Sequence, residues 1–315
     1  MNYQDCLQAY KSLCHKPLIT GKPNLLYAPI NYIMEQEGKK IRPVLCLMAH
    51  QLFNNNINYA FEVAYAIELF HNFSLVHDDV MDEAPIRRGE TSVHHKFGVN
   101  NAILSGDVML AYCYKLLEKY LDKHPNVYSI FSDNAIKVCE GQSFDMAFET
   151  KANVTIEEYI NMISLKTSVL LGASLQIGAL LANASKTNQI NLYEFGKNIG
   201  IAFQLMDDYL DAFADTAKFG KKVGGDIAQN KQTFLLITAK NLAPSKTQLL
   251  MNISDENEKI EQVKQLYIAL DIPKLCKAEM TKYQEKAFKH LNQVNCPNSK
   301  QHLTSLANKL FTRVK

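Results

Sequence analysis

Residues 74–85 read SLVHDDVMDEAP, and residues 203–213 read FQLMDDYLDAF. Each stretch contains the pattern Asp-Asp-x-x-Asp, formed by Asp78, Asp79 and Asp82 in the first and by Asp207, Asp208 and Asp211 in the second. With aspartate at roughly 6% of positions, one such pattern is expected by chance in about 7% of chains of this length, and two in only a fraction of one percent. The pair is therefore a specific signal.

The apolar residues around both patterns recur at the spacing of a helix rather than a strand. This periodicity predicts long, largely buried helices at Phe61–Val80, Ala102–Tyr120, Ile156–Ala184 and Ile190–Phe213. Glycine (13) and proline (9) are scarce among the 315 residues, which favours long helices. No sequence repeat or low-complexity linker divides the chain. We predict one all-α domain over residues 1–315, built as a single large helical bundle.

Composition excludes several classes of partner. A net charge of +2 is too small to favour nucleic acid or an anionic membrane surface. The seven cysteines are odd in number and form no C-x-x-C pair, so neither zinc nor a disulfide framework is expected, and a reducing, cytoplasmic location fits best. The stretch at 167–185, TSVLLGASLQIGALLANAS, is long enough to span a membrane, but Gln176 and several Ser and Gly residues interrupt it. We expect a buried core helix there and no membrane span.

The carboxylates of each acidic pattern require a cation. A spacing of four residues places Asp78 and Asp82 on one face of a helix, one turn apart, where like charges repel. Solvated acidic helix ends are the alternative, but the leucines, phenylalanines and methionines around both patterns argue against it. Ligand sets made only of carboxylates favour a hard ion. Mg²⁺ completes its shell with water and substrate phosphates, so the implied ligand is a diphosphate.

Basic residues lie close to both patterns in the sequence. Arg87 and Arg88 follow the first pattern at a turn, where guanidinium groups can hold phosphate oxygens. The stretch GKKIRP at 38–43 opens another predicted helix, with Pro43 in its first turn. Further candidates are Lys166 and Thr167, at the start of the long buried helix, and Lys221 and Lys231, which follow the second pattern. Each alone is more often a solvated residue.

Six segments together resemble the successive motifs of the trans-isoprenyl (polyprenyl) diphosphate synthases, of the short-chain farnesyl or geranylgeranyl type. They are GKKIRP, HNFSLVHDDVMDEAPIRRG, GQSFD, LKT, FQLMDDYLD and KFGKKVGGDIAQNKQT, in family order from Gly38 to Thr233. The resemblance implies an all-α isoprenoid synthase bundle with a central active-site cavity, a homodimer, and an aspartate-rich site for three Mg²⁺ ions.

The resemblance also implies roles for individual residues. Asp78 and Asp82 would ligate two Mg²⁺ ions and Asp207 a third, with Asp79, Asp208 and Asp211 as outer-shell or water-mediated partners. The allylic diphosphate would be held by Arg87, Lys166, Lys221 and Lys231, and the isopentenyl diphosphate by Lys39, Arg42, His71 and Arg88. Gln204 and Thr167 would flank the reacting carbons and the diphosphate, and Gln142 and Asp145 would lie on the cavity wall. The sequence departs from the family pattern at Glu37, Lys40 and Lys222, none of which is a named ligand.

The helix that carries Asp78 also suggests where chain growth stops. Phe73 and Ser74 precede Asp78 by five and four residues, which places them roughly 7.5 and 6 Å lower along a helix. A bulky ring there would form a floor under the growing tail. Phe73 as an ordinary core residue is the alternative. Phe73 beside the small Ser74 resembles short-chain members and indicates C15 to C20 products, with C20 favoured.

The expected activity is that of a prenyltransferase. It would condense isopentenyl diphosphate with dimethylallyl, geranyl or farnesyl diphosphate to an all-trans prenyl diphosphate by Mg²⁺-assisted ionisation, condensation and elimination. A class I terpene cyclase is one rival, but cyclases pair DDxxD with a different second motif and have no use for Lys39, Arg42 and Arg88. A non-catalytic regulatory subunit is another, but such subunits tend to lose aspartates. His77, directly before Asp78, is expected to be a packed, hydrogen-bonded histidine rather than a ligand.

Overall fold

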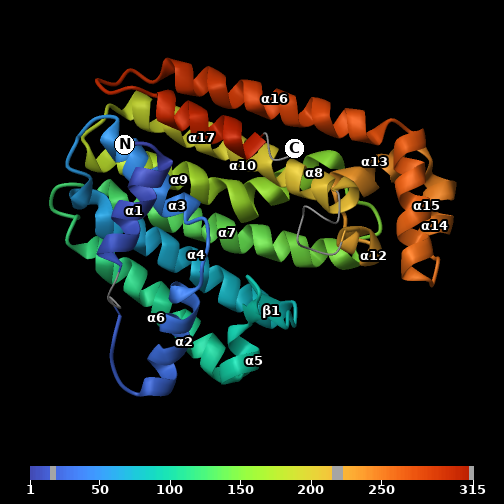
Figure 1. Ribbon diagram of the computed structural model, residues 1–315, viewed down its shortest axis with the longest axis horizontal. Helices are drawn as coiled ribbons and strands as arrows, with labels where there is room; N and C mark the ends of the chain where they lie inside the picture. Colours follow the sequence, from blue (N-terminus) through green and yellow to red (C-terminus); the bar gives the residue numbers. More distant parts are fainter. Residues whose placement is uncertain (15–18, 215–222, 312–315) are drawn as a thin grey trace. The chain divides into compact units, whose positions relative to one another are not determined.

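The structure is a computed structural model that describes residues 1–14, 19–214 and 223–311, and it is almost entirely helical (Figure 1). The first part of the chain forms α1 (Tyr3–Leu13), α2 (Asn24–Glu35), α3 (Ile41–Gln51), the 3₁₀ turn η1 (Ile57–Ala60), α4 (Phe61–Met81), β1 (Ile86–Arg87), β2 (Glu90–Thr91), α5 (Val93–Phe97), α6 (Val99–Glu118) and α7 (Asn126–Thr150). There follow α8 (Ile156–Ile163), the π turn η2 (Ser164–Ser168), α9 (Val169–Leu181), α10 (Lys186–Phe213), α12 (Gly225–Ala228), α13 (Phe234–Leu242), α14 (Pro244–Met251), α15 (Glu256–Ala269), α16 (Ile272–Gln293) and α17 (Gln301–Phe311). The all-α prediction is confirmed.

The chain divides into two compact units. The first comprises residues 1–135, 170–193 and 294–303, and the second comprises residues 136–169, 194–293 and 304–315. The first aspartate pattern belongs to the first unit and the second pattern to the second unit. That residues 1–315 act as one domain stays a prediction.

The first unit is organised around α4, which packs against α6 and α3. The middle of α4 is buried on every side and is apolar except for Glu68, and Ile67, Leu69 and Phe70 are at most 1% exposed. Phe70 also packs edge-on against Phe131 of α7, with ring centroids 5.5 Å apart. A helix that is apolar all round is stable only inside a core. The last turn of α4, which carries Asp78 and Asp79, is therefore anchored by the helix below it.

The second unit has a core formed by α10, α13 and α15. Leu205 of α10, Ile237 of α13 and Tyr267 of α15 all have an exposed fraction of 2% or less in one apolar cluster. Cys276 of α16 donates to the Leu205 carbonyl across 3.7 Å. This packing fixes the end of α10 that carries Asp207, Asp208 and Asp211.

The predicted helix at 156–184 is interrupted by a π turn. A capping box starts α8, because Thr155 Oγ1 accepts from the Glu158 amide at 3.1 Å and Glu158 Oε2 accepts from the Thr155 amide at 3.0 Å. At Ser164–Ser168 the hydrogen-bond pattern widens to that of a π-helix before α9 begins. The helical stretch Ile156–Leu181 is the one in the described part of the chain that is long and apolar enough to cross a membrane, and 78% of its most apolar window is buried. It therefore packs as a core helix.

Candidate active-site residues

In the first unit, Asp79 is fully buried and its carboxylate faces Arg87. Its Oδ1 accepts from Arg87 Nε at 2.9 Å and also from Nη2, and its Oδ2 has no hydrogen-bond partner. Burial lowers the pKa of Arg87, but the bond to Asp79 and the charges of Asp78 and Asp82 outweigh it, so the pKa is raised. Asp78 is half-buried, and Asp82 is exposed just beyond the end of α4. The two outer aspartates are thus the accessible ones.

A short hairpin after α4 carries the two arginines. In β1 and β2, Ile86 pairs with Thr91 and Arg87 with Glu90. The turn between them contains Arg88 at φ 55° and Gly89 at φ 83°, conformations that glycine adopts freely and other residues rarely. This turn directs the two neighbouring guanidinium groups to different partners, Arg87 to Asp79 and Arg88 to Asn72.

The residues predicted to hold isopentenyl diphosphate gather within this unit. Arg42 Nη1 lies 3.3 Å from His71 Nε2, and Arg88 Nη1 donates to Asn72 Oδ1 at 3.1 Å. Burial and the charges of Arg42, Arg88 and Lys40 hold the pKa of His71 well below its usual range. His71 is therefore neutral, so its Nε2 can accept from Arg42. Arg42, His71 and Arg88 thus lie together, and their role as ligands stays a prediction.

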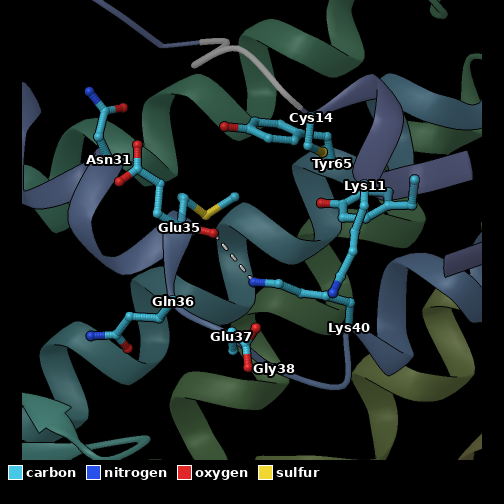
Figure 2. Close-up of a pocket in the computed structure, with 11 residues that line it drawn as sticks. Lys11, Cys14, Asn31, Glu35, Gln36, Glu37, Gly38, Lys40 and Tyr65 are labelled. Carbon is cyan, nitrogen blue, oxygen red and sulfur yellow. Dashed lines mark hydrogen bonds between the residues drawn. The ribbon is translucent and has the colours of Figure 1, made fainter. Parts of the chain in front are cut away.

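The GKKIRP stretch reaches this group through the start of α3. Lys40 adopts φ 46° at the N-cap of α3, and its Nζ donates to the Met34 carbonyl at 3.4 Å, the bond that Figure 2 shows as a dashed line. The same figure shows Lys40, Glu37 and Gly38 lining a cavity of about 340 Å³ that is also bordered by α1 and α2. Lys39 is exposed, and its carbonyl accepts from the Tyr3 hydroxyl. The two lysines therefore differ, one held inward and one facing solvent.

Phe73 is 7% exposed and lies among other rings of α4. Its centroid is 5.5 Å from that of Phe70 and 4.7 Å from that of His77. His77 donates to the Ile103 carbonyl of α6 at 3.1 Å and packs on Gly106, where a methyl group would clash with the imidazole. His77 is thus a packed, hydrogen-bonded histidine. Ser74 is half-buried and donates to the His71 carbonyl at 2.9 Å.

In the second unit, Asp208 is the buried aspartate. It accepts from the Tyr159 hydroxyl of α8 and from Gln204 Nε2 at 3.2 Å, one turn earlier on α10. Burial raises the pKa of Asp208 to about 6, although Tyr159, Lys231 and Gln204 act against this rise. Asp207 and Asp211 are half-buried. In both patterns the middle aspartate is buried. The hydrogen bonds to Asp79 come from a cation, and those to Asp208 come from neutral groups.

Asp226 is a further carboxylate beside the second pattern. The Asp226 amide donates to Asp211 Oδ2 at 3.0 Å, and the Asp226 carbonyl accepts from the Lys231 amide at 2.9 Å. Burial, and then the charge of Asp208, raises the pKa of Asp226 to about 7, against the opposing charge of Lys231. Lys231 itself is exposed, and Lys221 lies outside the described residues.

The π turn η2 carries Lys166 and Thr167, both half-buried. Lys166 Nζ donates to Asp145 Oδ2 of α7 at 2.6 Å. The two backbones are in close contact, because a Cβ at Gly141 would lie 2.2 Å from the Lys166 nitrogen. Gln142, next to Gly141, has a buried side-chain oxygen without a hydrogen-bond partner. Glycine is therefore required at 141 for η2 to sit where it does.

Several residues beside these groups were not singled out by the sequence. Tyr159 and Asp226 contact the second pattern, and Glu68 and Asn72 lie on α4 beside the basic group. For Asp226 and Asn72 the signal was present, since both lie inside the family-like segments. Glu68 could have been noticed as a charged residue in an otherwise apolar helix. Nothing in the sequence distinguishes Tyr159 from a core tyrosine.

The carboxylate oxygens of the two aspartate patterns are ligands of the kind that Mg²⁺ prefers. Asp78, Asp82 and Asp207 offer carboxylate oxygens that are not fully buried, and Asp79 Oδ2 is a buried oxygen without a partner. Within residues 1–14, 19–214 and 223–311, no three Asp, Glu, His or Cys side chains gather closely enough to form a metal cage by themselves. Carboxylates that need water and phosphate to complete a shell are typical of Mg²⁺ sites.

Comparison with known proteins agrees with this arrangement. Residues 23–270 match the polyprenyl synthetase family. The chain is 39% identical over 248 residues to a short chain isoprenyl diphosphate synthase of Methanocaldococcus jannaschii, covering 78% of this chain and 76% of that protein. It is 36% identical over 290 residues to a geranylgeranyl diphosphate synthase of Sulfolobus acidocaldarius, covering 89% and 88%. A crystal structure of a geranylgeranyl pyrophosphate synthase superposes with a TM-score of 0.94 at 38% identity over the full length of both chains. The chain therefore belongs to the polyprenyl synthetase family.

Proposed function

We propose that this prenyltransferase condenses isopentenyl diphosphate with an allylic diphosphate to give an all-trans prenyl diphosphate of C15 to C20, with C20 favoured. The observation that carries the proposal is the presence in one unit of an acidic pattern at Asp78 and Asp82 and a separate basic group at Arg42, His71 and Arg88. A terpene cyclase binds a single diphosphate and has no use for the second group. Relatives named as geranylgeranyl and short chain isoprenyl diphosphate synthases favour the same activity.

The metal site is proposed at the aspartates. Asp78 and Asp82 would ligate two Mg²⁺ ions and Asp207 a third, with Asp79, Asp208 and Asp211 in the outer shell. The engagement of Asp79 with Arg87 and of Asp208 with Tyr159 supports an indirect role for these two residues. Bound Mg²⁺ supplies Lewis-acid stabilisation of the negative charge that develops on the departing diphosphate.

The basic residues would divide between the two diphosphates. Arg87, Lys166, Lys231 and, by the family resemblance, Lys221 hold the allylic diphosphate. Lys39, Arg42, His71 and Arg88 hold the isopentenyl diphosphate. The guanidinium groups match phosphate oxygens in geometry and charge. On this assignment Arg87 and Arg88, adjacent in sequence, serve different substrates, and their different partners in the structure support this.

The chemistry needs no nucleophile from the protein. The allylic C–O bond breaks and its electron pair leaves with the diphosphate. The double bond of isopentenyl diphosphate then provides the pair for the new C–C bond, and a proton passes from the adjacent carbon to the released diphosphate. Gln204 and Thr167 flank the reacting carbons. Burial raises the pKa of all seven cysteines, so none is an activated thiolate.

A homodimer is also proposed. Leu25 on α2 and Val99, Ile103 and Leu104 on α6 are 40 to 63% exposed, and Leu25 and Leu104 line an apolar groove of about 470 Å³. Exposed apolar patches of this kind are typical of protein interfaces. A second copy of the chain would cover this surface.

Product analysis tests the proposed function. The protein is incubated with Mg²⁺, isopentenyl diphosphate and each allylic primer in turn, and the chain length of the products is measured. We expect C15 to C20 products, and loss of elongation in Asp78→Ala and Asp207→Ala. Cyclised products from an allylic diphosphate alone would favour the cyclase, and no elongation with any primer would contradict the synthase.

A further inference from the structure

Glu68 is a buried charge that the proposed mechanism does not use. It lies in the apolar middle of α4, ten residues before Asp78, and is 1% exposed. Removing a carboxylate from water is costly unless it is both paired with a cation and hydrogen-bonded. The groups that pair with the Glu68 carboxylate and donate hydrogen bonds to it therefore indicate why an acidic residue lies there.

Lys40 is the cation that pairs with Glu68. Its Nζ lies 3.1 Å from Glu68 Oε1, and the two side chains are only 8% and 2% exposed. Lys40 reaches this position from a left-handed backbone conformation at the N-cap of α3, which is unfavourable for a residue with a side chain. Figure 2 shows its side chain turned inward from the segment that contains Glu37 and Gly38. The start of α3 is thus tied to α4 through this ion pair.

Asn72, one turn after Glu68 on α4, connects it to Arg88. Asn72 Nδ2 donates to the Glu68 carbonyl at 2.7 Å and to Glu68 Oε1 at 3.1 Å, and Asn72 Oδ1 accepts from Arg88 Nη1 at 3.1 Å. A side-chain amide has donors at one end and an acceptor at the other. The backbone carbonyl and the carboxylate of Glu68 together hold the donor end, and the acceptor end faces Arg88.

The charge of Glu68 also acts on both arginines of the basic group. Burial lowers the pKa of Arg42 to about 10, and it lowers the pKa of Arg88 as well. In both cases the negative charge of Glu68 is the largest opposing influence. Arg42, Arg88 and Lys40 are thus three cations gathered around one buried anion.

We propose that Glu68 is a positioning residue for isopentenyl diphosphate, which sets the place of Arg88 through the Asn72 amide and ties the Lys40–Arg42 segment to α4 through Lys40. This inference rests on the proposed function, because it takes Arg42 and Arg88 as ligands of isopentenyl diphosphate. Glu68 itself does not touch the substrate, since like charges would repel.

The negative charge of Glu68 and its positioning role predict opposite effects on isopentenyl diphosphate binding when Glu68 is replaced, so the two can be told apart. If Glu68 acted only as a nearby negative charge, its removal would strengthen the attraction of the site for a diphosphate. If Glu68 holds Asn72 and Lys40 in place, its removal weakens binding, because the cations lose their fixed positions. The Michaelis constant for isopentenyl diphosphate therefore moves in opposite directions in the two cases.

The experiment compares Glu68→Gln with wild type in steady-state assays of both substrates, with melting temperature as the control for folding. We expect KM for isopentenyl diphosphate to rise about tenfold, the order expected for losing one hydrogen bond to a charged group, and KM for the allylic diphosphate to stay within about twofold. Glu62→Gln removes a partly exposed carboxylate from the same helix and is the matched control, with little change expected in either constant. A lower or unchanged KM for isopentenyl diphosphate, or an equal rise of both constants, overturns the proposal.

Asn72→Leu provides the second variant, which removes the bridge without changing any charge. It should raise KM for isopentenyl diphosphate in the same way, and the double variant should show less than the sum of the two effects, as expected for residues that act through one another. Asn72→Leu decides the question if Glu68→Gln does not fold. Arg88→Lys separates the two proposals. If KM for isopentenyl diphosphate is unchanged in Arg88→Lys, the assigned isopentenyl diphosphate site is contradicted. If this KM rises in Arg88→Lys but not in Glu68→Gln or Asn72→Leu, only the role of Glu68 is contradicted.

Discussion

At the scale of single residues, the middle aspartates of the two patterns show how similar motifs acquire different chemistry. Asp79 and Asp208 are both buried, but Asp79 faces a guanidinium group and Asp208 faces a hydroxyl and an amide. A hydrogen bond from a cation stabilises a buried carboxylate more than a hydrogen bond from a neutral donor does. This agrees with the raised pKa of Asp208. The pKa of Asp208 is thus set mainly by burial, which Tyr159, Gln204 and the charge of Lys231 offset only in part.

Burial also raises the pKa of Asp226, and this predicts how Asp226 affects stability. The folded-state pKa of Asp226 is raised to about 7 from an ordinary value of 3.8, so between these values the folded protein retains a proton that the unfolded chain has lost. Stability therefore falls as pH rises through this window, and the penalty is complete above about pH 7. We expect Asp226→Asn to raise the melting temperature of the metal-free protein more at pH 8 than at pH 5, as measured by thermal unfolding at both values.

Asp122→Asn is the control for this prediction, because Asp122 is exposed and replacing it should leave the pH dependence as in wild type. An equal gain from Asp226→Asn at both pH values would mean that the carboxyl group ionises in the folded state as it does in water.

Phe73 is the residue from which product length is predicted. Its ring is buried and held by Phe70 and His77, so it cannot easily turn aside for a longer prenyl tail. We expect Phe73→Ala to shift the products towards chains at least one isoprene unit longer, as measured by chromatography of the dephosphorylated alcohols. The core should lose about 3 to 5 kcal/mol of stability, as is usual for Phe→Ala.

Phe131→Ala is the comparison for Phe73→Ala. Phe131 is also buried and packs on Phe70 and Tyr114 rather than on Phe73. Phe131→Ala should therefore lower the stability by a similar amount without lengthening the product. Unchanged products from Phe73→Ala would identify Phe73 as an ordinary core residue.

At the scale of elements, the sequence predicted the long helices and missed the local departures from them. The helix predicted at 61–80 is α4 at Phe61–Met81, and the one predicted at 190–213 is most of α10. Apolar periodicity is strong in long helices, so their existence could be predicted. The π turn at Ser164–Ser168 could not, because it accompanies a backbone contact between Lys166 and Gly141, residues 25 positions apart in sequence. The partners of Asp79 and Asp208 likewise depend on contacts between elements.

The close contact between the backbones of Gly141 and Lys166 predicts the effect of adding a side chain at Gly141. Because a Cβ at Gly141 would lie 2.2 Å from the Lys166 nitrogen, Gly141→Ala must push α7 and η2 apart. We expect the free energy of unfolding to fall by about 1 to 3 kcal/mol, the usual cost of overpacking, and prenyl transfer to weaken because Lys166 is displaced. Denaturant unfolding and steady-state assays measure the two effects.

Ser143→Ala is the matched control on the same helix, since Ser143 is exposed and alanine favours helix. If Gly141→Ala were as stable and active as Ser143→Ala, the close approach of the two backbones would not be required for the position of Lys166.

At the scale of the whole molecule, the fold class was predicted from helical periodicity, and the family was predicted from the order of short motifs. Within the part of the chain that the structure describes, the two aspartate patterns lie at the ends of α4 and α10, which are packed in the core. Product length and assembly are less accessible to sequence reasoning, because both depend on surfaces. The prediction of product length rests on the ring of Phe73, and the proposed assembly rests on the exposed apolar groove between α2 and α6.

The exposed groove gives the prediction for assembly. Leu104 is 55% exposed on α6 and lines the groove, so replacing it by a charged residue should leave the core of its own chain unchanged. In a twofold-symmetric dimer each substitution occurs twice, and burying one leucine contributes about 1.5 to 3 kcal/mol. If the chains pair through this groove as proposed, Leu104→Glu should shift that dimer towards monomer while the fold is kept, as measured by light scattering and circular dichroism. Leu249 of α14 is 72% exposed and outside the groove, and Leu249→Glu should leave the dimer intact. A dimer that persists in Leu104→Glu would show that the chains associate through another surface.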